Sequence, residues 1–268
     1  MFSLDGKVCV ITGALGLLGH ELTRAFAEAG ARVVITDLDH GACVGRAHVL
    51  GATALGHGAD ITRPESLAAL LAAILDRFAR LDVLVNNAAI DDRFDPGAAA
   101  DESRFERYSL ARWQRMLDAN VTGMFLSCQT LGGAIAERCS PVASGSIINI
   151  SSIYGVVAPD QALYRRPDGT QAFYKSPAYP TAKAAVLGFT RYLAAYWGPS
   201  GVRVNAISPG GIHNGQDTYF VEAYARRTAL GRMAAPRDYA GAAVFLASDA
   251  SAYMTGANLV VDGGFTAW

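Results

Sequence analysis

The chain has 268 residues, of which 51% are hydrophobic, and its formal net charge at pH 7 is −1. This length and hydrophobic content suit one large α/β domain with a sizeable core. The near-zero charge and the lack of a cationic run argue against nucleic acid or an acidic membrane surface as a partner, so we expect small molecules instead.

The cysteines and the N-terminal residues indicate a reduced, cytoplasmic protein. Cys9, Cys43, Cys128 and Cys139 occur singly, without the paired or histidine-interleaved spacing of a disulfide framework or zinc site, so we expect no metal. Residues 1–7 include an acid and a glycine where a signal peptide has basic and then apolar residues, and no apolar run reaches the length of a membrane span.

Short β-branched runs alternate along the chain with alanine- and leucine-rich amphipathic segments. This alternation is typical of a parallel sheet with helices on both faces. The expected strands cover residues 8–12, 32–36, 83–85, 146–150, 203–207 and 258–261, and the expected helices cover residues 17–29, 64–77, 110–138, 179–197 and 236–246. The pattern predicts a single, doubly wound α/β domain over residues 1–268, with a parallel sheet of about seven strands.

Three segments stand out from this alternation. Thr62-Arg63-Pro64-Glu65 has the sequence of a capping box, with proline in the first turn of the helix that follows. Residues 91–109 and 154–178 are long and polar, and loops of that length inside a compact domain are usually functional or disordered.

Gly13, Gly16 and Gly19 follow the first expected strand and open the first expected helix. In this position a glycine-rich turn lets backbone N–H groups and the helix dipole hold a pyrophosphate. Asp37 ends the second strand about 20 residues downstream, where it would accept hydrogen bonds from ribose hydroxyls and repel a 2′-phosphate. The sequence therefore predicts a dinucleotide site that favours NAD over NADP, the alternatives being a plain tight turn and an ordinary strand-end acid.

Tyr179 and Lys183 lie four residues apart in an expected helix, so their side chains share one face. An ammonium within a few Å favours the phenolate, which would bring the pKa of Tyr179 toward neutral pH. The chain has 11 tyrosines and three lysines, so such a pair is uncommon by chance, although a solvated pair without function is the alternative. The pair predicts a proton donor and acceptor for carbonyl and alcohol chemistry.

Taken in order, the glycine turn, Asp37, Asn86-Asn87-Ala88-Ala89, Asn120, Ser152 and the Tyr179/Lys183 pair make the whole chain resemble the short-chain dehydrogenase/reductase family. The resemblance implies a Rossmann-type fold and an NAD-dependent, single-domain enzyme. Tyr179 would be the acid and base, and Lys183 would lower its pKa and hold the nicotinamide ribose. Ser152, rather than the competing Ser151, would hydrogen-bond the reacting oxygen. Asn120 would organise a proton-relay water, unless its amide only satisfies the backbone.

The resemblance also implies which residues contact NAD. Asp60 and Ile61 would contact the adenine, and Ile212 would reach the carboxamide through its backbone. The full implied set is Gly13, Leu15, Gly16, Leu17, Leu18, Gly19, Asp37, Leu38, Asp60, Ile61, Asn87, Ala88, Ala89, Tyr179, Lys183, Pro209, Gly210, Ile212 and Asn214.

The sequence departs from the family pattern at several positions. Gly16 comes one position earlier than the usual middle glycine, a spacing commoner among extended relatives that modify nucleotide sugars. Ala89 replaces a usual glycine, and Asn214 a usual threonine. The largest departure is the separation of Ser152 from Tyr179, 179 − 152 = 27 residues, roughly twice the usual value.

The inserted segment near 153–178 and a loop near 212–228 would form the walls of the substrate site. Arg165 and Arg166 could clamp a phosphate or carboxylate, and His213 and Gln216 add polar groups opposite. With Ser152, they predict a hydroxyl-rich substrate such as a sugar, sugar acid, cyclitol or sugar nucleotide. A solvated hairpin or a subunit contact is the alternative for the insertion. The chain also resembles, less specifically, dehydrogenases linked to surface-sugar pathways.

The main hypothesis is an NAD-dependent dehydrogenase acting on a secondary alcohol of a polar, carbohydrate-like substrate. A reductase of 3-oxoacyl thioesters or generic ketones would prefer NADPH, against which Asp37 argues. A nucleotide-sugar epimerase or dehydratase would need a longer C-terminal region, and a non-catalytic nucleotide sensor would typically lack the tyrosine or the lysine. By resemblance we expect a homotetramer or a homodimer.

Overall fold

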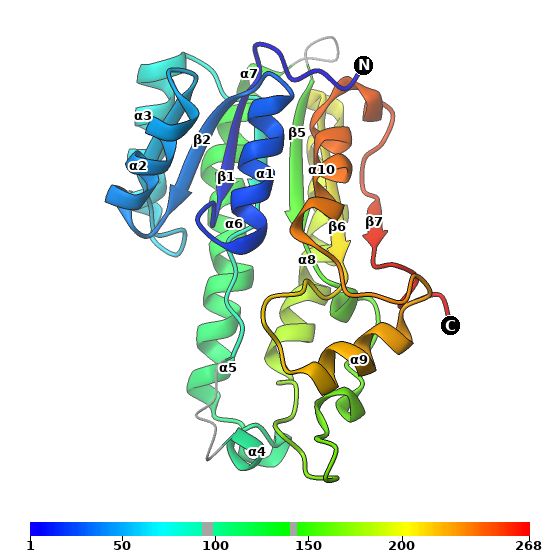
Figure 1. Cartoon of the computed structure of the whole chain (residues 1–268). Helices are drawn as coiled ribbons and strands as arrows, with labels where there is room; N and C mark the ends of the chain where they lie inside the picture. Colours follow the sequence, from blue (N-terminus) through cyan, green and yellow to red (C-terminus); the bar gives the residue numbers. More distant parts are fainter. Residues whose placement is uncertain (93–98, 140–143) are drawn as a thin grey trace.

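One seven-stranded parallel sheet spans the chain in the computed structural model, which describes residues 1–92, 99–139 and 144–268 (Figure 1). The strand order is β3-β2-β1-β4-β5-β6-β7. The strands are β1 Val8–Thr12, β2 Arg32–Asp37, β3 Ala54–Gly58, β4 Val83–Asn86, β5 Gly145–Ile150, β6 Val202–Pro209 and β7 Asn258–Val261. This is the doubly wound, Rossmann-type sheet that the sequence predicts.

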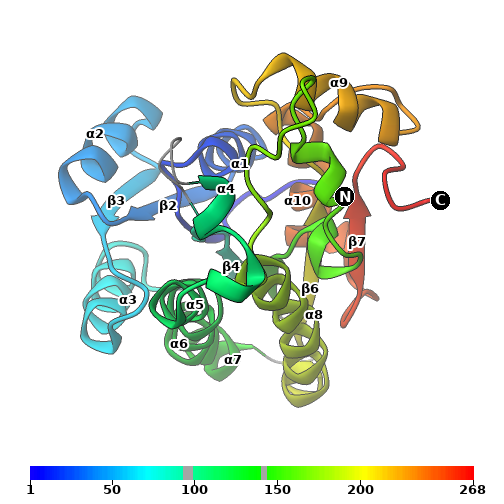
Figure 2. The same cartoon turned by 90° about the horizontal axis from the view of Figure 1, so that it is seen from below.

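Helices cover both faces of the sheet (Figure 2). One face carries α1 Leu17–Glu28, α2 His40–Leu50 and α10 Ala240–Ala247; the other carries α3 Pro64–Phe78, α5 Leu110–Leu117, α6 Gly123–Ser127, α7 Gly133–Arg138 and α8 Ala178–Trp197. Two helices, α4 Ala99–Glu102 and α9 Thr218–Arg227, lie below the sheet in Figure 1. Within the described ranges, no helix is both long enough and apolar enough to cross a lipid bilayer.

Strand β1 shows why the sheet needs cover on both faces. All five of its residues are buried, and successive side chains of a strand point to opposite faces. Val8 and Val10 therefore pack into the core beneath α3 and α8, whereas Cys9 and Ile11 pack into the core beneath α1 and α10. The result is two separate hydrophobic layers on either side of one sheet.

The strand order reverses direction at β1, which is paired with β2 on one side and β4 on the other. In a doubly wound sheet, the loops that leave neighbouring strands in opposite directions open a crevice at their carboxyl ends. The carboxyl ends of the strands point downward in Figure 1, toward α4 and α9. The fold thus places the predicted functional loops at one edge of the sheet.

The sequence analysis missed one strand, β3, and three helices, α2, α4 and α9. Strand β3 reads Ala-Leu-Gly-His-Gly and lacks the β-branched residues that mark the other strands. Two of its glycines are required by close packing, because a Cβ at Gly56 would lie 2.2 Å from the Cys43 carbonyl oxygen and one at Gly58 would lie 2.7 Å from the His40 Cβ. Helix α9 lies within the segment that was interpreted as the substrate loop.

One expectation about helices is confirmed and another is wrong. Residues 110–138 are helical throughout, as expected, and two turns within them, Asp118–Thr122 and Cys128–Gly132, are π-helical. Helix α3 begins at Pro64 as expected, but the capping box is wrong: Arg63 occupies the N-cap without a side-chain cap. The Thr62 hydroxyl instead donates to Asp60 at 2.7 Å.

The inserted segment between β5 and α8 folds back on itself. It contains two short 3-10 helices, Ile153–Gly155 and Gln161–Tyr164, and a hairpin closed by the Arg165–Gln171 bridge. Its buried Leu163 and Tyr164 pack in one hydrophobic cluster with Tyr224 of α9. The base of the insertion is therefore anchored by apolar packing, while the hairpin tip, residues 165–170, is exposed.

Candidate active site

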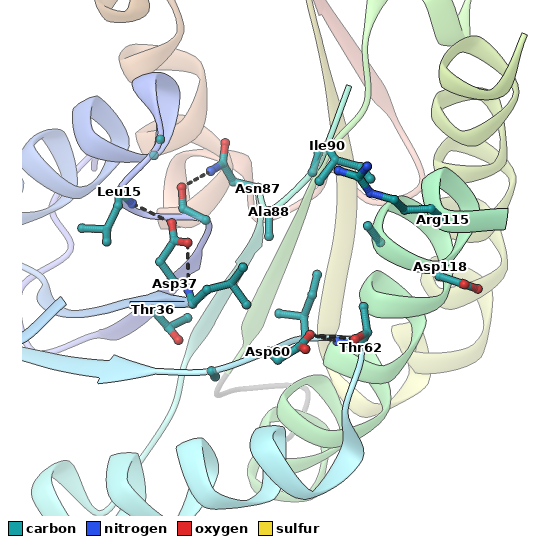
Figure 3. A pocket seen from close by; sticks show the side chains of 18 of the residues that line it. Leu15, Thr36, Asp37, Asp60, Thr62, Asn87, Ala88, Ile90, Arg115 and Asp118 are labelled. Carbon is teal, nitrogen blue, oxygen red and sulfur yellow. Dashed lines mark hydrogen bonds between the residues drawn. The ribbon is translucent and has the colours of Figure 1, made fainter. Parts of the chain in front are cut away.

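A cavity of about 1110 Å³ lies along the carboxyl ends of β1, β2 and β4 (Figure 3). Its volume exceeds that of most drug-sized pockets and suits an extended ligand. Most of the predicted cofactor residues line it, namely Gly13, Leu15, Gly16, Leu17, Leu18, Gly19, Asp37, Leu38, Asp60, Ile61, Asn87, Ala88 and Ala89. We call this space the dinucleotide cavity.

The glycine turn brings the backbone of β1 close to that of β4. Gly13 has a φ of +63°, and a Cβ at this position would lie 2.6 Å from the Ala88 Cα. A Cβ at Gly19 would lie 2.2 Å from the Gly13 carbonyl oxygen. No larger side chain fits without moving backbone atoms, so the turn has the narrow form that lets a pyrophosphate approach the first turn of a helix.

Thr12 and Asn87 lock this turn in place. The Thr12 hydroxyl accepts hydrogen bonds from the backbone N–H groups of Asn87 at 3.1 Å and Ala88 at 3.0 Å. In return, the Asn87 amide donates to the carbonyl oxygens of Thr12 and Gly13. Thr12 was not singled out from the sequence, and its signal was its place directly before the first glycine.

Asp37 faces the dinucleotide cavity from the end of β2 (Figure 3). One carboxylate oxygen accepts from the Leu15 N–H at 3.1 Å, and the other accepts from the Leu38 N–H at 2.8 Å. Each oxygen has a second lone pair that can accept a ribose hydroxyl. The carboxylate is thus oriented by the same turn that would hold the pyrophosphate.

A second cavity, of about 330 Å³, adjoins the first, and Leu18, Asn87 and Ala89 line both. We call it the catalytic cavity. It gathers Ser152, Tyr179 and Lys183 with Pro209, Gly210 and Ile212. Predicted residues separated by up to 60 positions in the chain therefore meet at one place beside the dinucleotide cavity.

Ser152, Tyr179 and Lys183 form a connected group. The Ser152 side chain acts on the Tyr179 hydroxyl in the direction that lowers the pKa of the tyrosine, and the Lys183 ammonium lies 5.8 Å from the centre of the Tyr179 ring. Lys183 donates to the Ile150 carbonyl oxygen at 2.8 Å. The competing serine, Ser151, donates instead to the Lys183 carbonyl oxygen at 2.7 Å, so the structure directs Ser152 and not Ser151 toward the tyrosine.

The pKa directions differ from the sequence-based expectation. Burial first, and then the Asp91 carboxylate, raise the pKa of Tyr179, against which the Ser152 hydrogen bond acts. Burial lowers the pKa of Lys183 to about 8. The expectation that Lys183 brings the pKa of Tyr179 toward neutral is wrong for this structure, because desolvation of the phenolate and the nearby Asp91 carboxylate dominate and Lys183 is not among the causes of the shift.

Asn120 lies in the first π-helical turn and is buried. Its amide oxygen accepts from the Ile90 N–H at 2.8 Å, and its amide nitrogen donates to the Ile90 carbonyl oxygen at 2.9 Å. Both ends of the side chain are therefore bonded to the loop after β4. In this structure the side chain of Asn120 positions that loop. The proton-relay water that the family resemblance implies would therefore have to bind the backbone of Asn120 rather than its side-chain amide.

The predicted substrate residues fall into two groups. Gln216 lines the catalytic cavity with Ser152. In contrast, Arg165 and Arg166 are exposed at the hairpin tip, and His213 is exposed without lining either cavity. Asn214, predicted to contact the cofactor, also lines neither; its backbone N–H donates to Gln216 at 2.7 Å.

Two charged residues of the catalytic cavity were missed, Asp91 and Lys175. They form an ion pair, and the Lys175 ammonium lies 4.3 Å from the centre of the Tyr179 ring. A signal was present in the composition: two of the three lysines, Lys175 and Lys183, flank Tyr179 at four residues on either side. Lys175 precedes α8, so helical spacing alone could not have placed it.

The glycine turn, the Asp37 carboxylate in the larger cavity and the adjoining Ser-Tyr-Lys group together fit a dinucleotide-binding protein of the Rossmann type. The residues present fit a nicotinamide dinucleotide, since the close Gly13–Ala88 approach leaves room for a pyrophosphate at the N-terminus of α1. The chain belongs to the short-chain dehydrogenase family: the family model described as short chain dehydrogenase matches residues 7–165, and one described as Enoyl-(Acyl carrier protein) reductase matches residues 168–266.

Curated relatives match over nearly their whole length. The chain is 36% identical to a D-threitol dehydrogenase of Mycolicibacterium smegmatis, over 99% of this chain and 95% of that protein. It is 35% identical to a galactitol 2-dehydrogenase (L-tagatose-forming) of Cereibacter sphaeroides, over 100% and 98%. It is also 38% identical to a 3-alpha-(or 20-beta)-hydroxysteroid dehydrogenase of Mycobacterium tuberculosis, over 98% and 91%.

Solved structures with nicotinamide cofactors share the fold. A gluconate 5-dehydrogenase from Burkholderia cenocepacia, in complex with NADP and tartrate, matches with a TM-score of 0.86 and 28% identity, over 100% of this chain and 98% of that chain. A short chain dehydrogenase from Leptospira borgpetersenii with bound NAD+ matches with a TM-score of 0.82 and 32% identity, over 98% and 94%. Both forms of the cofactor therefore occur among similar structures.

Proposed function

We propose that this chain is an NAD-dependent oxidoreductase that interconverts a secondary alcohol and a ketone on a polar, carbohydrate-like substrate. The observation that carries the proposal is that Ser152, Tyr179 and Lys183 line one cavity, with Lys183 on the same helix as Tyr179, and that this cavity shares wall residues with the dinucleotide cavity. A bound nicotinamide dinucleotide supplies the hydride acceptor for the alcohol or the hydride donor for the ketone.

The residues of the catalytic cavity divide the remaining work. Ser152 and Tyr179 hold the reacting oxygen between their hydroxyls, which fixes the carbon that bears it. Tyr179 gives a proton to that oxygen during ketone reduction and takes one during alcohol oxidation. Because burial raises the pKa of Tyr179, its hydroxyl is protonated at neutral pH and ready for the reduction step.

The choice of NAD rests on Asp37. Its carboxylate lines the dinucleotide cavity and is fixed by two backbone N–H groups. A carboxylate in this place accepts ribose hydroxyls and repels the added charge of a 2′-phosphate. The proposal extends to a cytoplasmic enzyme, supported by four cysteines without disulfides, and to a homo-oligomer, supported by the exposed Tyr192 and Tyr196 on α8.

The substrate class rests on the polar groups of the catalytic cavity and on similarity to polyol dehydrogenases. We propose that the insertion near 153–178 and the loop near 212–228 form its walls within one catalytic domain. A hydrophobic cyclic alcohol is the competing substrate, because Tyr154, Tyr164 and Phe220 also line the cavity and a hydroxysteroid dehydrogenase is among the relatives.

The test follows cofactor absorbance with a panel of polyols, sugars and cyclic alcohols, with NAD and NADP in parallel. We expect turnover of polyols with NAD. Ser152→Ala should lower kcat by about 100-fold, whereas Ser151→Ala, which removes a hydrogen bond to the backbone of α8, should cost far less activity. Equal losses in the two variants, or no turnover of any alcohol with either cofactor, would overturn the proposal.

A further inference from the structure

The ion pair between Asp91 and Lys175 takes no direct part in the proton transfer at Tyr179, although the Asp91 carboxylate helps to raise the pKa of that tyrosine. Asp91 comes from the loop after β4, and Lys175 from the end of the insertion, close to the start of α8. Both line the catalytic cavity. In Figure 2 the segment that carries Lys175 passes between α4 and α9, below the sheet.

The backbone around Lys175 is held independently of the ion pair. The Gln161 amide oxygen accepts from the Lys175 N–H at 2.8 Å, and its amide nitrogen donates to the Lys175 carbonyl oxygen at 3.2 Å. One residue earlier, the Tyr174 N–H donates to the Ser103 hydroxyl at 2.7 Å. Because these bonds already fix the segment, the side-chain ion pair is not needed to hold the insertion in place.

The other polar side chains of the cavity wall have their hydrogen bonds within the protein. The Tyr154 and Tyr164 hydroxyls bond to each other, and the Tyr224 hydroxyl accepts from the Gly211 N–H. The Gln216 amide is used at both ends by backbone groups of its own loop. Each of these groups thus has at least one hydrogen bond within the protein, and none of them bears a charge.

Asp91 and Lys175 are charged, and both have hydrogen-bonding capacity left for a ligand. An ammonium has three donors, and the structure assigns one of those of Lys175 to Asp91. The Asp91 carboxylate has about four acceptor positions, and within the described residues it accepts from Lys175 and from the Asp92 N–H. The side chain of Asp91 is 45% exposed and that of Lys175 is 12% exposed, so the acceptor is open while the donor is held over the Tyr179 ring.

We propose that Asp91 and Lys175 act as a paired acceptor and donor that binds the hydroxyl group on the carbon next to the one that reacts at Tyr179, in a neutral polyol. Lys175 is 4.3 Å from the centre of the Tyr179 ring, so its free donors lie next to the place of the reacting oxygen. The pair has no net charge, and the Asp91 carboxylate repels a substrate carboxylate. The substrate class is therefore a neutral vicinal polyol rather than a sugar acid. This inference rests on the proposed function.

The test compares four-carbon alcohols that share one skeleton: threitol, 2,3-butanediol, 1,3-butanediol and 2-butanol, with threonate as the acidic counterpart of threitol. Wild type should prefer the vicinal alcohols. Lys175→Met should lower kcat/KM for threitol and 2,3-butanediol by about 10- to 100-fold, the range for hydrogen bonds to a charged group, and for 2-butanol by less than about 3-fold. Lys175→Arg should recover part of the loss.

Lys7→Met is the matched control. Lys7 also forms an ion pair, with Asp249 at 2.7 Å, and its side chain is 18% exposed, but it lies on the far side of the fold from the catalytic cavity. It should leave the ratio between threitol and 2-butanol unchanged. NAD affinity and unfolding temperature, measured for every variant, separate a change in recognition from a displaced insertion.

Asp91→Asn provides a second, independent arm. It leaves the Lys175 cation without its anionic partner, so the preference for threitol over threonate should fall by about 10-fold or more. An equal loss on all alcohols in Lys175→Met, or no loss on any, would overturn the inference. So would a wild-type enzyme that oxidises 2-butanol as well as 2,3-butanediol, which leaves the proposed function intact. Failure to oxidise any alcohol in the series would overturn both.

Discussion

The dinucleotide cavity and the catalytic cavity share residues of the wall between them, but they are built in different ways. Around the first, close backbone approaches at Gly13 and Gly19 and one carboxylate, Asp37, determine the shape. Around the second, side chains from the insertion and α9 are brought together by aromatic packing. A short sequence motif can specify the local backbone geometry of the dinucleotide cavity. The shape of the catalytic cavity depends instead on how an inserted segment packs against the rest of the fold.

The largest expected effect is on kcat and comes from replacing Lys183 in the catalytic cavity, a change that should lower activity without lowering stability. Lys183→Met should lower kcat by about 1000-fold, because the side chain that would hold the nicotinamide ribose beside Tyr179 is lost. At pH 7 the same variant should unfold at an equal or higher temperature than wild type. Lys183 is 4% exposed, and burial lowers its pKa from 10.5 to about 8, so below pH 8 the folded state bears the cost of holding a buried cation.

The pH dependence gives this prediction its sign. Between pH 8 and 10.5 the unfolded chain binds a proton at Lys183 that the folded chain has released, so the stability of wild type rises with pH over that window. The shift corresponds to roughly 3 kcal/mol at most, offset by the lost hydrogen bond to Ile150. The stability advantage of Lys183→Met should therefore shrink from pH 7 to pH 10. An advantage that grows with pH would contradict this.

The next effect tests the backbone character of the dinucleotide cavity. Gly13→Ala should destabilise the fold by about 2–4 kcal/mol, since the new Cβ meets the Ala88 backbone and φ is positive. Gly45→Ala is the control, because Gly45 lies within α2 and a Cβ there meets nothing within 4 Å. It should stabilise by up to about 1 kcal/mol. Chemical denaturation of both variants measures the two changes in the free energy of unfolding. Similar changes would contradict the claim that the close backbone approach at Gly13 excludes a side chain.

Asp37→Ala should have a smaller effect, confined to the cofactor. Without the carboxylate, kcat/KM for NAD should fall by about 10-fold or more, while that for NADP should stay level or rise, since repulsion of the 2′-phosphate is lost. Steady-state kinetics with both cofactors check this. If the wild type already prefers NADP, the role assigned to Asp37 is wrong.

The smallest effect concerns the hairpin tip. Arg165 and Arg166 are exposed and line neither cavity, so the double variant Arg165→Ala/Arg166→Ala should change kcat/KM for the best polyol by less than about 2-fold, as for most surface sites. A loss above about 10-fold would show that these arginines reach the substrate after all, and would move the boundary of the substrate site to the tip of the insertion.

These differences explain how much could be predicted from the sequence. The alternation of hydrophobic segments predicted the sheet and most of the helices. The positions of the glycines and of Asp37 predicted most of the residues that line the dinucleotide cavity. Strand β3 did not, because Gly56 and Gly58 are there for packing against α2 and carry no strand signal. Arg165 and Arg166 were named as substrate residues for their charge, and Lys175 was not considered, because the fold of the insertion that turns Lys175 inward cannot be read from the sequence.

The pKa of Tyr179 marks a further limit. Spacing places Lys183 on the same helix face, and the structure confirms that its ammonium lies near the Tyr179 ring. Desolvation cannot be read from spacing, and it is the largest cause that raises the pKa of Tyr179. The Asp91 carboxylate is the second cause that raises the pKa of Tyr179. It reaches the tyrosine from the loop after β4, and no sequence motif indicates this contact.

The most direct test of the central claim, that Tyr179 transfers the proton beside a separate dinucleotide cavity, is Tyr179→Phe. NAD affinity by calorimetry and turnover of the best polyol are measured on the same preparation. The phenylalanine keeps the ring that packs against Lys175 but removes the hydroxyl, so turnover should fall by about 1000-fold or more while the Kd for NAD stays within about 3-fold of wild type. Turnover at the wild-type rate would contradict the catalytic role of Tyr179.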